Sequence, residues 1–414
     1  MTGVPTASIP RVVGRIVAST PGPTVIVTGA LHGNEPAGVH ALQRVFARLG
    51  SGRPALRGEI VGLVGNRRAL ARGRRYLDFD LNRTWTATGL AQRPARGAEH
   101  EATERRELLA AVLRAFRRAR GSVYHIDLHT TSGDSPPFST IADTLRNRRF
   151  ALRLPVPVVL GLEEHLEGTL LTYTAELGAV TMGFEGGRHD DPEAVTRCEA
   201  CIWLGLTAAG SFAPPDDPKE VRWARTALRN ATLDLPRVLE VRYRHAIGPD
   251  DGFRMAPGYR GFTLIRGGEA LAMAATGPVR APETGRVLMP LYQAQGDDGF
   301  FVMREFKPFW LAVSAAVRRL HLDALLPVLP GVHAAGAPGS LVIHRRVARW
   351  YAKEIFHLLG YRREREEGDL LLVSRRRERP RPVPASFARG RRGRPRASAT
   401  DRGDMPVGTG SWGS

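Results

Sequence analysis

Cysteine is almost absent from this chain of 414 residues, since its only two, Cys198 and Cys201, form a single Cys-x-x-Cys. A zinc knuckle needs a second pair, so none is expected here. The pair falls in a stretch with helical spacing, which favours packing inside a helix over redox chemistry. A chain with so few cysteines has no disulfide framework, which is typical of proteins in a reducing compartment. We therefore expect a cytoplasmic location.

Long apolar runs are missing too. None approaches the ~18 residues that a membrane-spanning helix needs. The segment from Met1 to Arg15 lacks the continuous apolar stretch of a secretion signal. We therefore expect no membrane partner.

Lysine is scarce, yet arginine gives the chain a net charge of +19. The tail from Ser374 is rich in Arg, Pro, Gly and Ser and lacks apolar periodicity, which is typical of disorder. Within it, Arg392 to Arg396 (Arg-Gly-Arg-Pro-Arg) spells the core of an AT-hook-like motif for the DNA minor groove. A single copy in an Arg-rich tail is weak evidence, and we do not expect nucleic acid to be the main partner.

A buried strand followed by a His and a Glu is the most informative pattern that is present. The apolar, β-branched run Val25–Thr28 ends in Gly29, and His32 and Glu35 follow. Pro36 then opens a helical stretch, because proline fits the first turn of a helix. The imidazole and the carboxylate can thus enter one crevice, and they are two of the three protein ligands of a catalytic zinc.

A second strand supplies the third ligand. Period-two alternation places His125, Asp127 and His129 on one side of the run that begins at Val123. His129 stands at the carboxyl end and is the ligand candidate. Asp127 is placed to orient an imidazole, and His125 lies deeper and is expected to be packed.

A third strand-like run, from Gly178 to Arg188, places Glu185 at its end. Ligands of open α/β sheets bind beyond the carboxyl ends of strands, so Glu185 is the candidate general base for an attacking water. Taken singly, each pattern has another interpretation: a surface or capping pair, a core histidine, or a plain strand end. Their joint placement favours one site.

The segment from Gly65 to Trp85 surrounds two aspartates, Asp78 and Asp80, with arginines and amides. An Asn beside an Arg, as at Asn82 and Arg83, forms a clamp for a carboxylate. A further Arg can face an oxygen that becomes negative in a tetrahedral intermediate. The alternative is a solvated basic loop in which the aspartates pair with arginines; it applies best to Arg67, Arg68, Arg72 and Arg74.

These segments resemble the succinylglutamate desuccinylase/aspartoacylase family of zinc carboxypeptidase-like metallohydrolases. The matching pieces are Gly29–Gly38, Arg75–Arg83, Asp127–Thr130 and Phe184–Gly187, which occur in the family's order within the first half of the chain. The resemblance implies one zinc ion per chain, amide hydrolysis, and a small-molecule N-acyl carboxylate as substrate. It also implies these roles: zinc ligands His32, Glu35 and His129, general base Glu185, carbonyl-polarising Arg75, and substrate-binding Asn82 and Arg83.

The chain departs from the family pattern at two places. Aspartoacylases carry a substrate-binding Arg shortly before the catalytic Glu, where ungapped counting finds Ala175. A Tyr from the family's C-terminal domain has no clear counterpart, although Tyr292 lies in the right region. N-acyl derivatives of neutral amino acids are therefore expected to compete with N-acetylaspartate, unless Arg188 supplies the missing charge.

The expected fold class is α/β, with a mixed, zinc carboxypeptidase-like sheet flanked by helices. A small β-barrel-like domain over the site and a short C-terminal α+β module follow it. The expected boundaries are 1–213 for the catalytic domain, 214–235 for a linker, 236–305 for the β-rich domain, 306–373 for a helical and hairpin module, and 374–414 for the tail.

Three functions remain open at this stage. The first is a zinc deacylase for N-acyl amino acids or related small carboxylates. The second is a metallocarboxypeptidase acting on short peptides, which a covering β-domain disfavours because peptides need an open groove. The third is a non-enzymatic, DNA-associated protein acting through its tail, which an intact ligand set disfavours.

Overall fold

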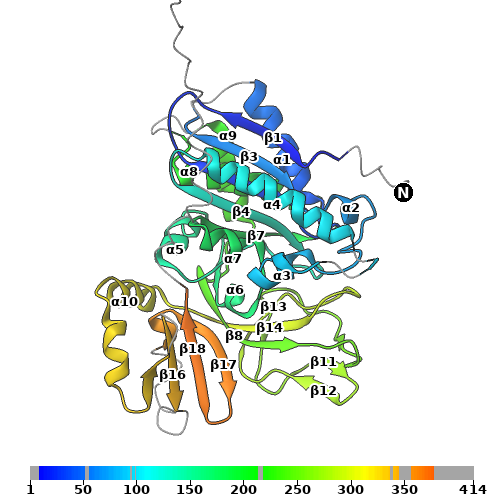
Figure 1. The fold of residues 1–414 in the computed structure, drawn as a ribbon. Coiled ribbons are helices and arrows are strands. Elements are labelled where there is room, and N and C mark those ends of the chain that lie inside the picture. Colours follow the sequence, from blue (N-terminus) through cyan, green and yellow to red (C-terminus); the bar gives the residue numbers. More distant parts are fainter. Residues whose placement is uncertain are drawn as a thin grey trace, which may run out of the picture. The chain divides into compact units, whose positions relative to one another are not determined.

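The computed structural model describes residues 9–51, 56–93, 96–97, 99–212, 218–335, 339–344 and 356–376. The chain divides into two units, Met1–Pro382 and Val383–Ser414. The second unit, with the AT-hook-like run, lies outside the described residues. All elements below belong to the first unit (Figure 1).

An eleven-stranded mixed sheet runs through this unit, in the order β1-β3-β2-β4-β7-β5-β6-β8-β14-β13-β10. Its central strands β2, β4 and β7 run parallel, so their carboxyl ends meet at one edge. The strands are β1 (Val12–Val17), β2 (Thr24–Gly29), β3 (Glu59–Val64), β4 (Val123–Thr131), β5 (Phe138–Ile141), β6 (Val158–Leu160), β7 (Val180–Arg188), β8 (Val238–Ala246), β10 (Leu264–Ile265), β13 (Gly285–Leu288) and β14 (Asp298–Glu305).

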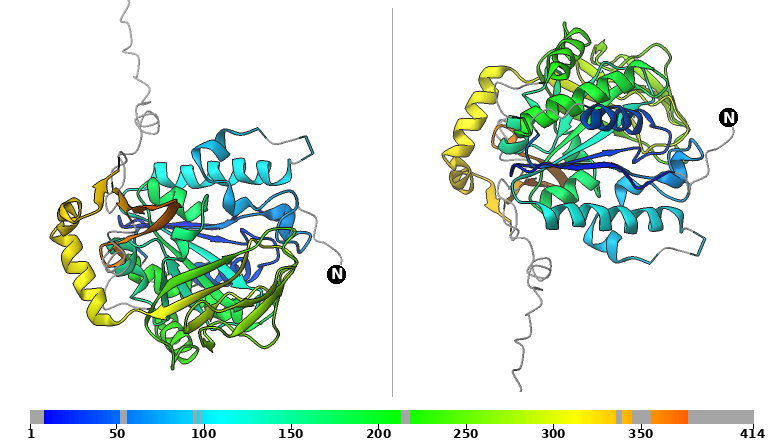
Figure 2. Two further views of the ribbon diagram at one scale, coloured as in Figure 1. Left: turned by 90° about the horizontal axis from the view of Figure 1, so that it is seen from below. Right: turned by 90° about the horizontal axis from the view of Figure 1, so that it is seen from above.

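Helices cover both faces of the sheet around β2, β4 and β7, and Figure 2 shows α4 on one side with α1, α8 and α9 on the other. The helices of this part are α1 (Ala37–Ser51), α2 (Arg67–Leu70), η2 (Leu81–Arg83), α3 (Ala87–Ala91), α4 (His100–Arg118), α5 (Leu145–Ala151), α6 (Leu162–His165), α7 (Leu170–Glu176), α8 (Glu193–Ala209) and α9 (Lys219–Asn230).

Alternation along β2 explains why both faces are covered. Val25 and Val27 belong to the core with Leu42 of α1 and Trp203 of α8. Ile26, which points to the opposite face, packs in a second core with Leu108 of α4. A strand that is buried on both faces has a continuous apolar sequence, and Val25–Val27 in β2 fit this pattern. The expected α/β fold with a helix-flanked mixed sheet is confirmed.

The β-rich region begins by extending the large mixed sheet. β8 pairs in parallel with β6, with Val158 beside Val238, and β14, β13 and β10 follow outward. Only β9 (Arg254–Met255), β11 (Ala270–Ala274) and β12 (Gly277–Arg280) form a separate, three-stranded sheet. The described strands therefore do not close into a barrel of their own, because the open edge at β6 offers unpaired backbone groups to β8.

The C-terminal module consists of α10 (Pro308–Arg319), η3 (Leu322–Val328) and a four-stranded antiparallel sheet. The sheet order is β15 (Val332–Ala334), β16 (Ser340–His344), β18 (Leu370–Arg375) and β17 (Tyr361–Glu367). The predicted hairpin is present, turning at Gly368 with a φ of 61°. Residues 345–355 of this module lie outside the described residues.

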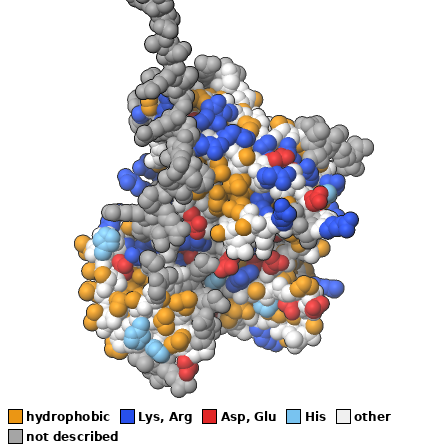
Figure 3. All heavy atoms as spheres, in the orientation of Figure 1, with side chains coloured by type: hydrophobic (Ala, Val, Ile, Leu, Met, Phe, Trp, Pro, Cys, Tyr) orange, Lys and Arg blue, Asp and Glu red, His pale blue; other side chains and the backbone are white. Residues whose placement is uncertain are grey.

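The two cysteines lie in the hydrophobic core. Cys198 and Cys201 are free and buried in α8, as predicted. Within the described ranges, no helix is long and apolar enough to span a membrane. Figure 3 shows basic side chains over α4, where Arg106, Arg114 and Arg117 are exposed, so the positive charge is not confined to the tail.

Candidate active site

The residues predicted to bind metal meet at the carboxyl edge of the parallel strands. His32 and Glu35 lie in the loop between β2 and α1, and His129 lies near the end of β4. Tight packing positions this loop. A Cβ at Gly33 would lie 2.1 Å from the Ala69 carbonyl carbon, and the Gly33 N–H donates to the Arg75 carbonyl at 3.0 Å.

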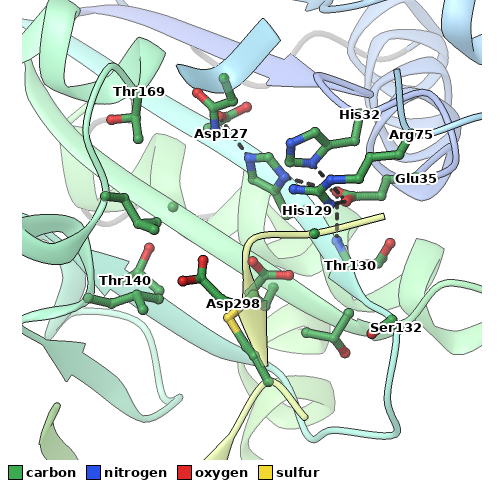
Figure 4. A pocket seen from close by; sticks show the side chains of 18 of the residues that line it. His32, Glu35, Arg75, Asp127, His129, Thr130, Ser132, Thr140, Thr169 and Asp298 are labelled. Carbon is green, nitrogen blue, oxygen red and sulfur yellow. Dashed lines mark hydrogen bonds and ion pairs between the residues drawn. The ribbon is translucent and has the colours of Figure 1, made fainter. Parts of the chain in front are cut away.

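Three side chains converge there on a volume suited to one cation. One ligand atom from each of His32, Glu35 and His129 lies within 4.8 Å of the others. His32 Nδ1 is 2.8 Å from Glu35 Oε1, and His129 Nδ1 is 2.9 Å from Glu35 Oε2. Both imidazoles thus turn the same nitrogen toward a shared carboxylate (Figure 4).

The opposite nitrogen of each imidazole faces an aspartate. His129 Nε2 lies 2.9 Å from Asp127 Oδ2, and Thr28 Oγ1 donates a hydrogen bond to the other oxygen of Asp127. His32 Nε2 lies 3.3 Å from Asp80 Oδ1. Carboxylates in these positions set the tautomer and orientation of metal-binding imidazoles. Asp127 was predicted in this role. For Asp80 the sequence offered only a pair with arginine, which Arg75 supplies at 3.2 Å, and the contact with His32 was not predicted.

Charge coupling holds the cluster together. Burial alone would disfavour the charged forms, yet Asp127 and Glu35 raise the pKa of His129 well above its ordinary value. Against the same burial, His32 and His129 hold the pKa of Glu35 well below its usual range. A divalent cation matches this set, because two imidazole nitrogens and a carboxylate are the donors that zinc prefers.

Glu185 lies beside the cluster on β7, in register with His129 on β4. Its side chain is buried, and its Oε2 atom has no hydrogen-bond partner among the described residues. Burial raises the pKa of Glu185 to about 8, with His129 opposing the shift and Glu35 adding to it. A nearby divalent cation would lower that pKa, because it favours the ionised carboxylate.

Arg75, Asn82 and Arg83 all reach the same cavity. Arg75 contacts Glu35 Oε1 at 3.6 Å and Asp80 Oδ2 at 3.2 Å. Asn82 Oδ1 accepts from the Leu170 N–H at 2.9 Å, which ties its loop to α7. Arg83 extends toward Asp298, with 3.8 Å between the charged atoms.

The remaining charged residues of this loop do not enter the cavity. Asp78 accepts from the His100 N–H at 2.7 Å at the start of α4. Arg67 and Arg68 form ion pairs with Glu104 of α4. The expectation that these two arginines are solvated is therefore wrong, because α4 brings a buried carboxylate to them.

The cavity has a volume of about 110 Å³ and extends beyond the metal-type cluster. Thr140 and Thr169 lie across it from His32 and Arg75 (Figure 4). Residues of the segment 289–301, which follows β8 in the sequence, also line it. The lining side chains that the sequence patterns did not single out include Thr130, Glu163, His189, Met289, Leu291, Gln293, Asp298 and Phe301.

Three positions considered from the family pattern lie elsewhere. Tyr292 is not among the lining residues, and its hydroxyl donates to the Ala256 carbonyl at 2.7 Å. Arg188 is paired with Asp190 at the surface. Ala175 lies on α7 and does not line the cavity. No arginine from these positions replaces the one expected before Glu185.

The segment that carries these residues is similar to known proteins. Residues 21–194, which are less than half of the chain, match the model of the succinylglutamate desuccinylase/aspartoacylase catalytic domain. The succinylglutamate desuccinylase of Burkholderia pseudomallei strain 1710b is 34% identical over 110 residues, or 26% of this chain. The chain spans only 30% of the length of that curated relative.

Solved structures share the fold over a larger part of the chain. The succinylglutamate desuccinylase/aspartoacylase of Rhodobacter sphaeroides has a TM-score of 0.53 and 20% identity, covering 71% of this chain and 88% of that one. The succinylglutamate desuccinylase of Vibrio parahaemolyticus also has a TM-score of 0.53, with 16% identity, covering 73% and 94%. At these identities the likeness concerns the fold alone.

Proposed function

We propose that this chain, whose residues 21–194 match the succinylglutamate desuccinylase/aspartoacylase catalytic domain, is a zinc-dependent deacylase. It would cleave the amide bond of an N-acyl amino acid or a related small carboxylate. One zinc ion per chain would be held by His32, Glu35 and His129. We expect the enzyme to act in the cytoplasm.

One observation carries the proposal: the convergence of His32, Glu35 and His129 beside a buried, unpartnered Glu185 oxygen. Structural zinc sites are closed by four protein ligands, whereas catalytic sites have three and leave a position open. The metal would act as a Lewis acid that acidifies water and polarises a carbonyl oxygen.

The chain's own groups would do the rest of the chemistry. Glu185 is placed to take the proton of the attacking water and to return it to the leaving nitrogen. Arg75, held by Glu35 and Asp80, can donate hydrogen bonds to the carbonyl oxygen as it becomes negative. Burial excludes bulk water and strengthens these interactions.

Asn82 and Arg83 are the proposed clamp for the substrate carboxylate. A guanidinium offers a planar fork of donors that matches a carboxylate. The cavity also has apolar walls, including Leu162, Leu166 and Phe301, that suit the carbon skeleton of a small substrate.

A metallocarboxypeptidase is the second candidate, because the same ligand set serves peptide hydrolysis. The covered cavity of about 110 Å³ disfavours it. A peptide would have to displace the segment around Leu291 and Gln293. DNA binding through the tail would involve residues outside those described, and no geometry supports it.

An activity screen of the zinc-loaded protein tests the proposal. The panel contains N-acetyl and N-succinyl amino acids and, as competitors, dipeptides and tripeptides with free termini. We expect hydrolysis of N-acyl amino acids, with higher kcat/KM than for any peptide. Greater activity on peptides would favour the carboxypeptidase, and no hydrolysis of any compound would remove both.

A further inference from the structure

A buried carboxylate at the far end of the cavity has no part in the chemistry described so far. Glu163 belongs to α6, is only 6% exposed, and lines the cavity. Its Oε1 accepts from Thr140 Oγ1 at 3.1 Å, and its Oε2 lies 3.5 Å from Thr169 Oγ1. Thr169 Oγ1 is also 2.9 Å from Thr172 Oγ1, so its single proton is shared. The carboxylate is therefore short of donors.

Two other acids of the cavity have cationic partners. Asp127 faces His129, and Asp298 is paired with Arg244. The hydrogen bonds that the described residues offer the Glu163 carboxylate come only from threonines. Arg376 approaches this region, but it donates to the Glu163 backbone carbonyl at 3.2 Å.

Burial and the neighbouring Glu164 raise the pKa of Glu163, although the hydrogen bond from Thr140 and the charge of Arg376 oppose the shift. A buried acid in this situation is costly to ionise unless a positive charge comes to it. The cavity leaves room for such a charge to arrive with the substrate.

Glu163 and the proposed general base Glu185 line the same cavity. Gly183 and Glu185 lie on the same side of β7, two residues apart, which is about 7 Å along a strand. A Cβ at Gly183 would lie 2.4 Å from Thr140 Oγ1 and 3.6 Å from Glu163 Oε1. The Thr140 hydroxyl occupies the space that a Gly183 side chain would take, so the absence of that side chain brings Thr140 and Glu163 close to β7. The length suits a side chain of a few carbons.

We propose that Glu163 is a specificity-determining residue that receives an ammonium group at the far end of the substrate. The preferred substrates would then be N-acyl derivatives of short diamino acids. Their carboxylate would bind Asn82 and Arg83, and their free amine would bind Glu163 with Thr140. This inference rests on the proposed deacylase activity and names the substrate class for it.

Three substrates built on five-carbon amino acids test the inference: Nα-acetylornithine, Nα-acetylnorvaline and Nα-acetylglutamate. They end in an ammonium group, a methyl group and a carboxylate. Zinc-loaded wild-type protein should have a kcat/KM for the ornithine derivative at least about tenfold above the other two, since hydrogen bonds between charged groups in a desolvated site are strong. Glu163→Gln should bring the ornithine and norvaline derivatives to within about threefold of each other.

Glu164→Gln is the matched control. Glu164 is the adjacent residue on α6 and is equally buried, but it accepts from the Asp143 N–H at 2.7 Å and does not line the cavity. This variant should keep the wild-type ratio. Product inhibition of the wild type gives the same discrimination without a variant, because free ornithine should inhibit at lower concentration than norvaline.

The outcomes separate the two proposals. Equal or better hydrolysis of the norvaline or glutamate derivative by the wild type would overturn the inference and leave the deacylase standing. Persistence of the ornithine preference in Glu163→Gln would overturn the role of Glu163. Absence of hydrolysis of every N-acyl amino acid would remove the proposed function and this inference together.

Discussion

Asp143 and Arg362 lie 219 positions apart in the chain, yet Arg362 Nε donates to Asp143 Oδ2 at 2.7 Å and both side chains are buried. Arg148 and Arg318 bind the same carboxylate. Arg362 also pairs with Glu240 of β8 at 2.7 Å. This charge network joins α5, α10, β8 and β17, and so it gives the C-terminal module a structural role in supporting the catalytic sheet.

Asp143→Ala should strongly destabilise the protein, because it leaves three guanidinium groups without their shared carboxylate. Breaking a buried ion pair by removing one partner costs about 3–5 kcal/mol. The measurement is the melting temperature and the midpoint of urea unfolding. Asp190→Ala, which breaks the surface pair with Arg188, is the control and should leave both unchanged. Equal effects of the two variants would contradict the role of the network.

The same network predicts acid sensitivity. Burial opposes ionisation, but the three arginines hold the pKa of Asp143 well below its usual range. His357 and Arg362 lower the pKa of Glu240 to about 2 in spite of its burial. A carboxylate with a depressed folded pKa contributes stability that is present above its unfolded pKa, about 4, and is lost as the pH falls. Part of the stability should therefore disappear between about pH 4.5 and pH 2, and Asp143→Asn should reduce that loss.

The cluster of His32, Glu35 and His129 could be predicted from the sequence for a physical reason. His32, His129 and Glu185 each follow or end an apolar run, and the carboxyl ends of parallel strands meet at one edge of a sheet. Asp80 was expected only to pair with its arginine-rich neighbours, and its additional contact with His32 was not predicted. Local patterns thus gave the residues that end strands, but not the choice between competing ionic partners.

Other features depend on contacts that no local pattern contains. The pairing of Val158 with Val238 makes the β-rich region an extension of the catalytic sheet. The same sheet order brings α6, and with it Glu163, to the cavity that holds Glu185. Neither the register of β8 nor the position of α6 carries a short motif, so spacing alone could not have predicted them.

The first prediction for the site concerns metal content. Purified protein should contain about one zinc per chain, and His32→Ala or His129→Ala should remove most of it. His40→Ala is the control, since His40 is exposed on α1 and should leave zinc content unchanged. Metal analysis of the dialysed variants provides the measurement. An unchanged zinc content in both ligand variants would contradict the proposed metal site.

The variant Glu185→Gln should show whether Glu185 acts as a zinc ligand or as the general base. The variant should retain zinc but lose kcat by a factor on the order of 10² or more, because an amide cannot take a proton from water. In the wild type, Glu185 must be ionised to act. Bound zinc should lower its pKa from the value of about 8 that burial produces, so the acid limb of the kcat/KM profile should lie below pH 8. If substantial activity survives in the variant, another group is the base.

The variants Arg83→Ala and Arg75→Ala should affect different kinetic parameters. A carboxylate clamp binds the ground state and the transition state equally, so Arg83→Ala should mainly raise KM. An oxyanion donor acts mostly in the transition state, so Arg75→Ala should mainly lower kcat, by ~10²–10³. Arg75 also contacts Glu35 and Asp80, so zinc content must be measured in the same samples to separate lost metal from lost oxyanion stabilisation. Steady-state kinetics on the best N-acyl amino acid decides the matter: a rise in KM alone for Arg75→Ala, with zinc retained, would reassign that guanidinium to substrate binding.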